Sequence, residues 1–320
     1  MNNFIDMLIM KLKEMLSEDY HLEQVASVKN NSQQYQGIQV RKKGYSAGPV
    51  FYVYGLYNDY LSEEKTIEEC AEELKTEIKN HQPFNFDMTY IKSYERIRDL
   101  VHVMLVNYEA NAGQLREQPH VRFLDLAAIF YIGIDFNDEA KGTIIVTNEL
   151  LEIWNVDKEE FIKEHLGRQI KNERAVYCEL GDLLNMMAED LISKGLILAE
   201  VKDDIVSAQK HFYMLTNEAH RYGANMLLNT AYLHKIATEL EDNLLIFPAS
   251  VHEILVAPES DKAVSYFTGK DVAVINLQNV HPEERLSNNV YLYDRNSKEI
   301  RIFHKGISLA QLEKIQNMMK

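Results

Sequence analysis

The side chains best suited to chemistry stand in a short polar group between two apolar runs. Ser250, His252 and Glu253 lie between Asn243-Leu-Leu-Ile-Phe-Pro-Ala and Ile254-Leu-Val-Ala-Pro. Polar side chains beside buried strands must find hydrogen-bond partners or face a cleft. This segment therefore predicts either a structural hydrogen-bond network or a functional site.

Ser250 and His252 are two residues apart, so on an extended chain both side chains face the same way. A serine beside a histidine is typical of a nucleophile with its general base, and Glu253 is an alternative partner for His252. These three are the candidate catalytic residues of a small-molecule hydrolase, although the Gly-x-Ser-x-Gly turn is missing. The structural alternative is a bend at Pro248-Ala249-Ser250 in which Ser250 and His252 bond to backbone groups.

His252-Glu253 also resembles the beginning of the His-Glu-x-x-His motif of zinc proteases. The second histidine would stand at position 256, which is valine, so this class is excluded. In the strand predicted over residues 251–257, His252 and Glu253 point to opposite faces. Three dispersed histidines are the alternative source of metal ligands: His211, His220 and His234. We expect no metal site and no cofactor.

A second candidate is Asn217-Glu-Ala-His-Arg-Tyr-Gly223, between a predicted strand and a predicted helix. At such a junction backbone N–H groups converge on small anions, and Arg221 would supply positive charge. In the structural alternative Asn217 caps the helix and the other side chains lie on the surface. If a pocket exists, this loop and residues 250–253 line it, so the predicted ligand-binding residues are Asn217, Arg221 and His252.

The elements that must position these groups mix strands and helices without a regular βαβ rhythm. The first part predicts an opening helix with a stripe of Phe4, Leu8, Leu12 and Met15, then three short strands. Thr66-Ile-Glu-Glu is a capping box that begins a helix with Cys70 on its apolar face.

Later segments predict strands over residues 123–135, 142–147, 211–217, 244–247 and 251–257, and a hairpin over 290–303. Helices are predicted from Asp157 to about residue 170, over 177–194 and 223–240, and after Ser308. The fold class is α+β, with mixed, mainly antiparallel sheets and packed helices. We expect units at residues 1–112, 113–205 and 206–320.

Composition limits the function. Lys and Arg number 34 against 49 Asp and Glu, and the net charge of −15 argues against general nucleic-acid binding. The longest strongly apolar run, residues 126–134, is too short to cross a bilayer as a helix, and no signal peptide is evident. Two cysteines match a reducing compartment, so we expect a cytoplasmic protein. Cys178 stands near the start of a predicted helix, where its thiol has either a lowered pKa or a packing role.

Several phrases in a fixed order resemble a bacterial family of unknown function, domain-of-unknown-function family 5688, common in gut Firmicutes. They are Leu105-Val-Asn-Tyr-Glu109, Phe123-Leu-Asp-Leu-Ala127, Leu215-Thr-Asn217, Gly223-Ala224 followed by Leu227-Leu228, and Phe247-Pro-Ala-Ser-Val-His-Glu253. The resemblance covers most of the chain. It implies a bacterial, cytosolic setting and no particular mechanism.

Without a complete catalytic motif, the sequence favours a non-catalytic binding or interaction protein, with a protein partner or a small ligand. A predicted helix with five glutamates could recruit a basic partner, or it could present an ordinary solvated face. These glutamates are Glu68, Glu69, Glu72, Glu73 and Glu77. The alternative function is a hydrolase or other enzyme that uses His252 with Ser250 or Glu253.

Overall fold

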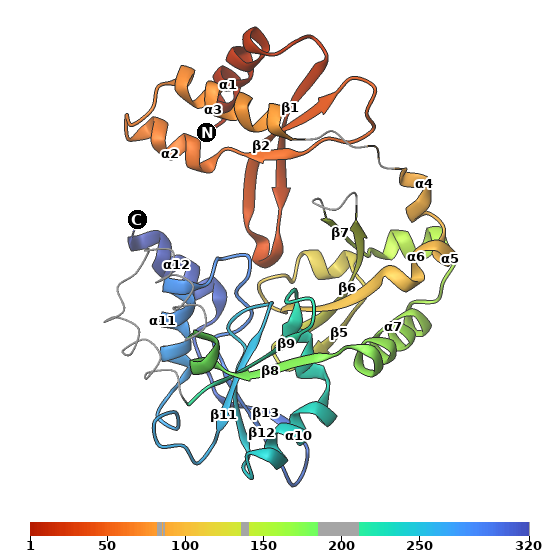
Figure 1. Ribbon diagram of the computed structural model, residues 1–320, viewed down its shortest axis with the longest axis vertical. Helices are drawn as coiled ribbons and strands as arrows, with labels where there is room; N and C mark the ends of the chain where they lie inside the picture. Colours follow the sequence, from red (N-terminus) through yellow and green to blue (C-terminus); the bar gives the residue numbers. More distant parts are fainter. Residues whose placement is uncertain (82–84, 86, 136–140, 185–210, 320) are drawn as a thin grey trace. The chain divides into compact units, whose positions relative to one another are not determined.

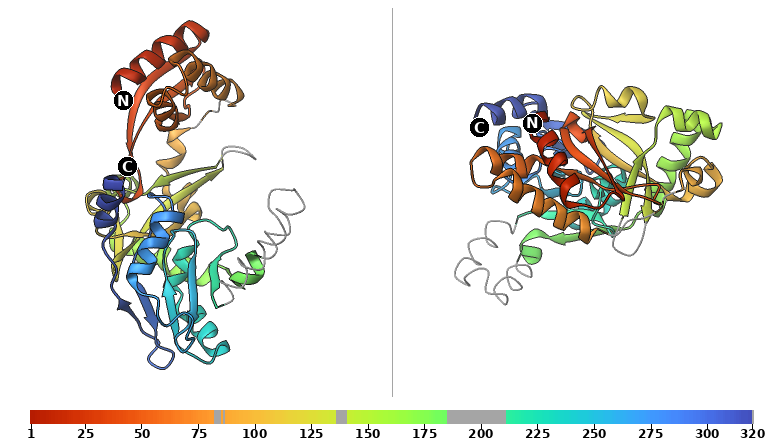
Figure 2. Two further views of the ribbon diagram at one scale, coloured as in Figure 1. Left: turned by 90° about the vertical axis from the view of Figure 1, so that its left-hand side faces the viewer. Right: turned by 90° about the horizontal axis from the view of Figure 1, so that it is seen from above.

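The computed structural model describes residues 1–81, 85, 87–135, 141–184 and 211–319 (Figures 1 and 2). They divide into two compact units, one of residues 1–99 with 134–142 and one of residues 100–133 with 143–320. Three mainly antiparallel sheets accompany the helices, which confirms the α+β class. The predicted boundaries at 112/113 and 205/206 stay predictions, and the second lies outside the described residues.

The first unit is a three-stranded antiparallel sheet packed with helices. The strands, in sheet order, are β1 (Tyr20–Val28), β2 (Gln34–Lys42) and β3 (Val50–Tyr52). The helices are α1 (Asn2–Met15), α2 (Tyr54–Leu61), α3 (Ile67–Asn80), α4 (Met88–Ile91) and α5 (Tyr94–Ile97). Figure 1 shows α1, α2 and α3 gathered at one end of the β1–β2 hairpin, whose other end extends beyond them.

The core of the first unit follows the predicted apolar stripes. Phe4, Leu8 and Leu12 of α1 are buried in one cluster with Cys70 and neighbouring residues of α3, because both helices turn their apolar faces inward. The α3 capping box is present, with the Thr66 side chain accepting from the Glu69 N–H and the Glu69 carboxylate accepting from the Thr66 N–H. The core role predicted for Cys70 is confirmed.

The second unit contains two sheets. The larger has the strand order β13-β12-β10-β11-β9-β8, and the smaller has β4-β6-β5 with β7 paired to β6. The larger sheet consists of β8 (Ala175–Glu179), β9 (Tyr213–Asn217), β10 (Leu244–Phe247), β11 (Ile254–Pro258), β12 (Val290–Tyr293) and β13 (Ile300–His304). The smaller consists of β4 (Val101–Asn107), β5 (His120–Phe123), β6 (Leu126–Asp135) and β7 (Lys141–Ile145). Residues 134–135 of β6 and 141–142 of β7 are grouped with the first unit.

The helices of the second unit lie between these strands in the sequence, except α12, which follows the last strand. They are α6 (Asn148–Trp154), α7 (Lys158–Asn172), α10 (Thr230–Glu239), α11 (Gly269–Asn279) and α12 (Leu309–Met319). The 3₁₀ turns of the chain are η1 (Asn30–Ser32), η2 (Arg98–Leu100), η3 (Gln114–Glu117) and η5 (Gly223–Leu228). Helices α11 and α12 pack side by side through a small apolar cluster around Leu309 and Leu312 (Figure 1).

The apolar run at residues 244–247 forms the predicted strand, β10, and it lies between β11 and β12. All four of its residues are buried, as a central strand requires. The predicted hairpin near residues 290–303 is also present, with the Asp294 carboxylate accepting from the N–H groups of Asn296 and Ser297 in the turn. The local turn chemistry was therefore readable from the sequence.

Three predicted elements differ from the structure. Residues 177–179, predicted as the beginning of a helix, belong to strand β8, which pairs with β9; residues 185–194 lie outside the described part. The predicted strand at 123–135 is divided by a tight turn at Leu124, whose φ is 56°. The predicted helix at 223–240 is divided at Asn229, which caps α10 by accepting from the Tyr232 N–H.

A buried polar network joins the two sheets of the second unit. The carboxylate of Asp125, in the β5–β6 turn, accepts from the Tyr291 hydroxyl at 2.5 Å and from the Ser287 hydroxyl at 2.7 Å. Asn107, at the end of β4, donates to the Leu286 carbonyl at 3.0 Å. Since Asn107, Ser287 and Tyr291 are buried, these bonds satisfy polar groups that would otherwise lose their hydration without compensation.

Candidate functional site

The two candidate segments of the sequence lie against each other in the second unit. The Tyr222 N–H donates to Nδ1 of His252 at 3.2 Å, and the two rings stack with centroids 5.5 Å apart and an interplanar angle of 15°. Thr216 at the end of β9 donates its hydroxyl to the His252 carbonyl at 2.7 Å. The loop at residues 217–223 and the segment at 250–253 therefore form one arrangement.

Ser250 lies in a bend whose hydrogen bonds are to the backbone. Its Oγ accepts from the His252 N–H at 3.0 Å, and its side chain is buried. The main chain at 248–251 is paired with residues 284–287, including a bridge between Ser250 and Arg285. These bonds hold the bend, so β11 begins at Ile254 and not at residue 251 as predicted.

His252 is held by both of its ring nitrogens. Because a backbone N–H donates to Nδ1, we assign the ring proton to Nε2, which lies 3.5 Å from Oε1 of Glu284. Glu253, next in the chain, makes no side-chain hydrogen bond or ion pair with a described residue. His252 and Glu253 stand in the loop before β11, so the predicted alternation along a strand does not apply to them.

Asn217 closes the loop that carries Arg221. Its Oδ1 accepts from the Arg221 N–H at 3.2 Å and its Nδ2 donates to the Arg221 carbonyl at 3.0 Å. His220 and Tyr222 on either side have left-handed backbone conformations, with φ of 49° and 55°. Left-handed residues other than glycine cost about 1 kcal/mol or more, and such strain is concentrated at functional loops.

Gly223 allows the close approach of this loop to β9 and to the 250–253 bend. A Cβ at this position would lie 2.6 Å from the Asn217 nitrogen and 2.7 Å from the His252 carbonyl oxygen, and it would also clash with the Thr216 hydroxyl. Only glycine fits without displacing backbone. The Tyr222–His252 contact therefore depends on Gly223, the residue that follows Tyr222.

Arg221 is the charged group that this loop presents. Its guanidinium donates to the Thr143 hydroxyl at 2.6 Å and lies 5.0 Å from the centroid of the Tyr222 ring. It forms no ion pair with any acidic residue in the described ranges.

Two residues that the sequence did not predict as part of the site contact the loop that carries Arg221. The Tyr131 ring from β6 meets the Tyr222 ring edge-on at 5.0 Å, and burial raises the pKa of Tyr131, so its hydroxyl stays neutral. Burial also raises the pKa of Glu173, which is hydrogen-bonded to Asn217 and to Gln169. Neither residue lies in a polar motif, and both reach the loop through contacts between segments far apart in the sequence.

The side chains weighed as metal ligands are dispersed. Within the described ranges, no three or more His, Cys, Asp or Glu residues group closely enough to hold a metal ion. His211 pairs with Asp261, and His220 is exposed in the 217–223 loop. Cys178 lies in β8, where burial raises the pKa of its thiol, contrary to the lowered value considered from the sequence.

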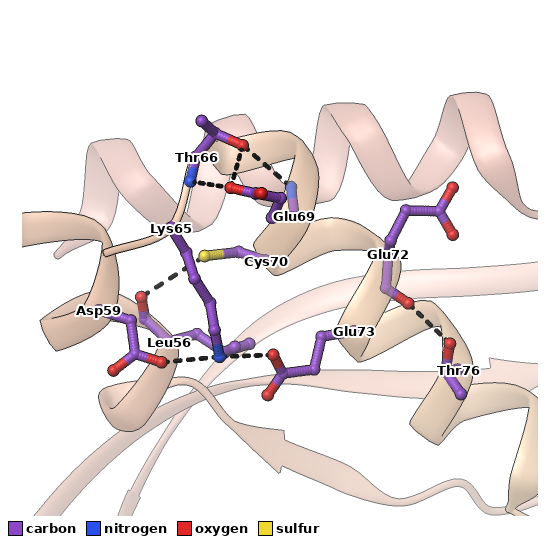
Figure 3. A network of polar contacts seen from close by, with 9 residues as sticks. All are labelled: Leu56, Asp59, Lys65, Thr66, Glu69, Cys70, Glu72, Glu73 and Thr76. Atoms are coloured by element: carbon purple, nitrogen blue, oxygen red, sulfur yellow. Dashed lines mark hydrogen bonds and ion pairs between the residues drawn. The ribbon is translucent and has the colours of Figure 1, made fainter. Parts of the chain in front are cut away.

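Three of the five glutamates of the acidic helix α3 pair with lysines of α3 and of neighbouring segments. Figure 3 shows Lys65 between Asp59 and Glu73, with Nζ–O distances of 2.9 and 2.6 Å. Glu72 pairs with Lys75 at 2.9 Å, and Glu68 pairs with Lys11 at 3.1 Å. Glu69 is bound to Thr66 in the capping box. This compensation favours the solvated-face reading of the helix over a surface that recruits a basic partner.

Fold and site together define a two-unit α+β protein with a preorganised, arginine-centred loop. The sequence profile of a family of unknown function (DUF5688) matches residues 1–295, so the chain belongs to this family. Comparison with curated proteins and with solved structures found no match. None of the helices in the described part of the chain has the length and apolarity needed to cross a membrane.

Proposed function

We propose that this protein is a non-catalytic binding protein whose site is centred on Arg221 and takes a small anionic ligand. The observation that supports it is the guanidinium of Arg221, which is half-buried, stacked on Tyr222 and not paired with a described carboxylate. A planar guanidinium with unused donors is well matched to a carboxylate or a phosphate group. Asn217 and His252 serve as positioning residues for the loop.

The loop geometry supports binding because hydrogen bonds within the chain fix it. Two side-chain bonds from Asn217 and one from the Tyr222 N–H to His252 hold the backbone around Arg221. A preorganised site loses less conformational entropy when its ligand binds. The strain at His220 and Tyr222 is consistent with a loop kept for function rather than for stability.

The enzymatic alternative receives no support from these contacts. A serine nucleophile needs its hydroxyl on the imidazole, whereas Ser250 Oγ accepts from the His252 backbone and Nδ1 of His252 accepts from Tyr222. Glu253 makes no contact with the ring. We also propose a cytoplasmic, bacterial setting, in line with the low cysteine content and the family resemblance.

Calorimetric titration of the full chain with inorganic phosphate, citrate and succinate at low ionic strength tests the anion site. We expect Arg221→Gln to weaken binding of the preferred anion by about tenfold to a hundredfold, since charge-assisted hydrogen bonds contribute about 1.5–3 kcal/mol. Arg174→Gln is the matched control, because Arg174 is an exposed arginine near the same loop, 3.7 Å from Glu218. Equal losses in both variants, or no measurable binding of any of the three anions, would sink the proposal.

A further inference from the structure

The second unit contains an apolar cavity away from the Arg221 loop. It has a volume of about 140 Å³ and is lined by residues 211–212 just before β9, by the segment 263–267, and by residues at β10, β11 and α11. Phe212, Phe247 and Phe267 form its aromatic wall, with ring centroids 5.4 to 6.1 Å apart and interplanar angles of 73° to 86°. Val264 and Leu255 are among the aliphatic residues that complete the lining.

The dimensions of the cavity fit a single aromatic ring. An apolar cavity of about 150 Å³ in another protein stays dry and binds benzene. Edge-to-face contacts with aromatic side chains add to the burial of a ring, and three phenylalanines already adopt that geometry with one another. The occupant is therefore a one-ring compound rather than a long acyl chain or a nucleotide.

One polar side chain also lines the cavity and is held in a defined orientation. His211 contacts the Asp261 carboxylate through Nδ1 at 2.7 Å. Asp261 is fixed in turn, because its other oxygen accepts from the Ala263 N–H at 2.8 Å. An ionised carboxylate only accepts hydrogen bonds, so Nδ1 of His211 carries the proton.

The position of the proton on Nδ1 of His211 determines which polar group a ligand needs. In the neutral imidazole the proton on Nδ1 leaves Nε2 as an acceptor, and Nε2 makes no hydrogen bond with a described residue. Because the His211 side chain is 44% exposed, a ligand hydroxyl competes with water for Nε2. A ligand that offers a hydroxyl donor satisfies Nε2, whereas a plain arene does not. We propose that this cavity is a binding site for a small phenol, whose ring lies among the three phenylalanines and whose hydroxyl donates to His211.

Fluorine NMR with 4-fluorophenol as the probe tests the site on the full chain. We expect saturable broadening and a shift of its resonance, with fluorobenzene bound about fivefold more weakly, as loss of one net hydrogen bond predicts. In His211→Phe the two probes bind equally. His281→Phe is the matched control, since His281 is an exposed histidine 3.7 Å from Glu283 and does not line the cavity, and it keeps the preference.

A second variant and a second measurement locate the probe. Ala249→Leu places a larger side chain at the cavity wall and abolishes binding of both probes, with the Trp154 fluorescence unfolding midpoint as the check on folding. Intermolecular NOEs between 4-fluorophenol and the Val264 methyl groups supply the location in the wild-type chain without relying on a variant. Absence of those NOEs, equal affinity of wild type for the two probes, or no binding at millimolar concentration would each overturn the proposal.

Discussion

Two buried tyrosines of one strand provide a direct test of the polar network that joins the sheets of the second unit. Tyr291 and Tyr293 of β12 are both fully buried. The Tyr291 hydroxyl donates to Asp125 at 2.5 Å, whereas the Tyr293 hydroxyl has no hydrogen-bond partner among the described residues. Replacing each by phenylalanine removes the same atom from two very different environments.

Tyr291→Phe is expected to lower the free energy of unfolding by about 1.5–3 kcal/mol, the usual contribution of a hydrogen bond to a charged group. Burial and the neighbouring Asp125 charge raise the pKa of Tyr291 far above its ordinary value, so the hydroxyl is the donor at neutral pH. Tyr293→Phe removes a buried, unsatisfied hydroxyl and is expected to be neutral or stabilising.

Urea unfolding followed by the fluorescence of Trp154 measures both variants, because the chain has one tryptophan and it is buried in the second unit. With a denaturant dependence of about 3 kcal/mol per M, Tyr291→Phe lowers the midpoint by roughly 0.5–1 M. The Tyr293→Phe midpoint stays at or above that of wild type. Equal shifts for the two variants would refute the assignment of the Asp125 bond as the stabilising contact.

Three further predictions concern the loop and a helix cap. Glu173→Gln raises stability at pH 7, because burial raises the pKa of Glu173 and disfavours its ionised form in the folded state. Urea midpoints should show this gain shrinking as the pH falls through the raised pKa and absent below about 4.3, the ordinary pKa of Glu in the unfolded chain. Thr66→Ala destabilises α3 by about 1 kcal/mol in amide hydrogen exchange, whereas Thr76→Ala, which removes only a bond to the Glu72 carbonyl within the helix, has little effect (Figure 3). Gly223→Ala lowers the stability of the second unit by about 1–3 kcal/mol in the Trp154 assay, whereas Gly113→Ala, whose added Cβ meets no atom within 4 Å, leaves it unchanged.

Local chemistry made much of the fold predictable. The capping box at Thr66 and Glu69, the N-cap at Asp157 and the apolar run of β10 each act within a few residues of sequence. Such elements are predictable because the side chains within them favour a cap or a central strand, whichever other element packs against it. The α+β class follows from their mixture.

Non-local pairing explains what the sequence did not predict. Tyr177 reads as part of a Leu- and Met-rich helix, yet it lies in β8 because β9 offers a pairing edge and Tyr213 stacks on its ring at 5.3 Å. The same applies to the site. Arg221 and His252 were recognisable as polar residues near strand ends, but the contact of Tyr131 with Tyr222 depends on packing between the two sheets, which no local pattern records.

The hydrogen-bond partners of Asp125 lie far along the chain, so the second unit cannot finish folding during synthesis until they have been made. Tyr291 follows Asp125 by 166 residues and Ser287 follows it by 162. At about 5–20 residues per second a ribosome needs roughly 10–30 s to add that length. During this interval the Asp125 carboxylate lacks both hydrogen-bond partners, so we expect it to remain hydrated. We therefore expect the smaller sheet to stay incompletely packed until the segment that carries Ser287 and Tyr291 has been synthesised. A nascent chain halted before residue 287 should therefore be a better chaperone substrate than one released a few residues after residue 291.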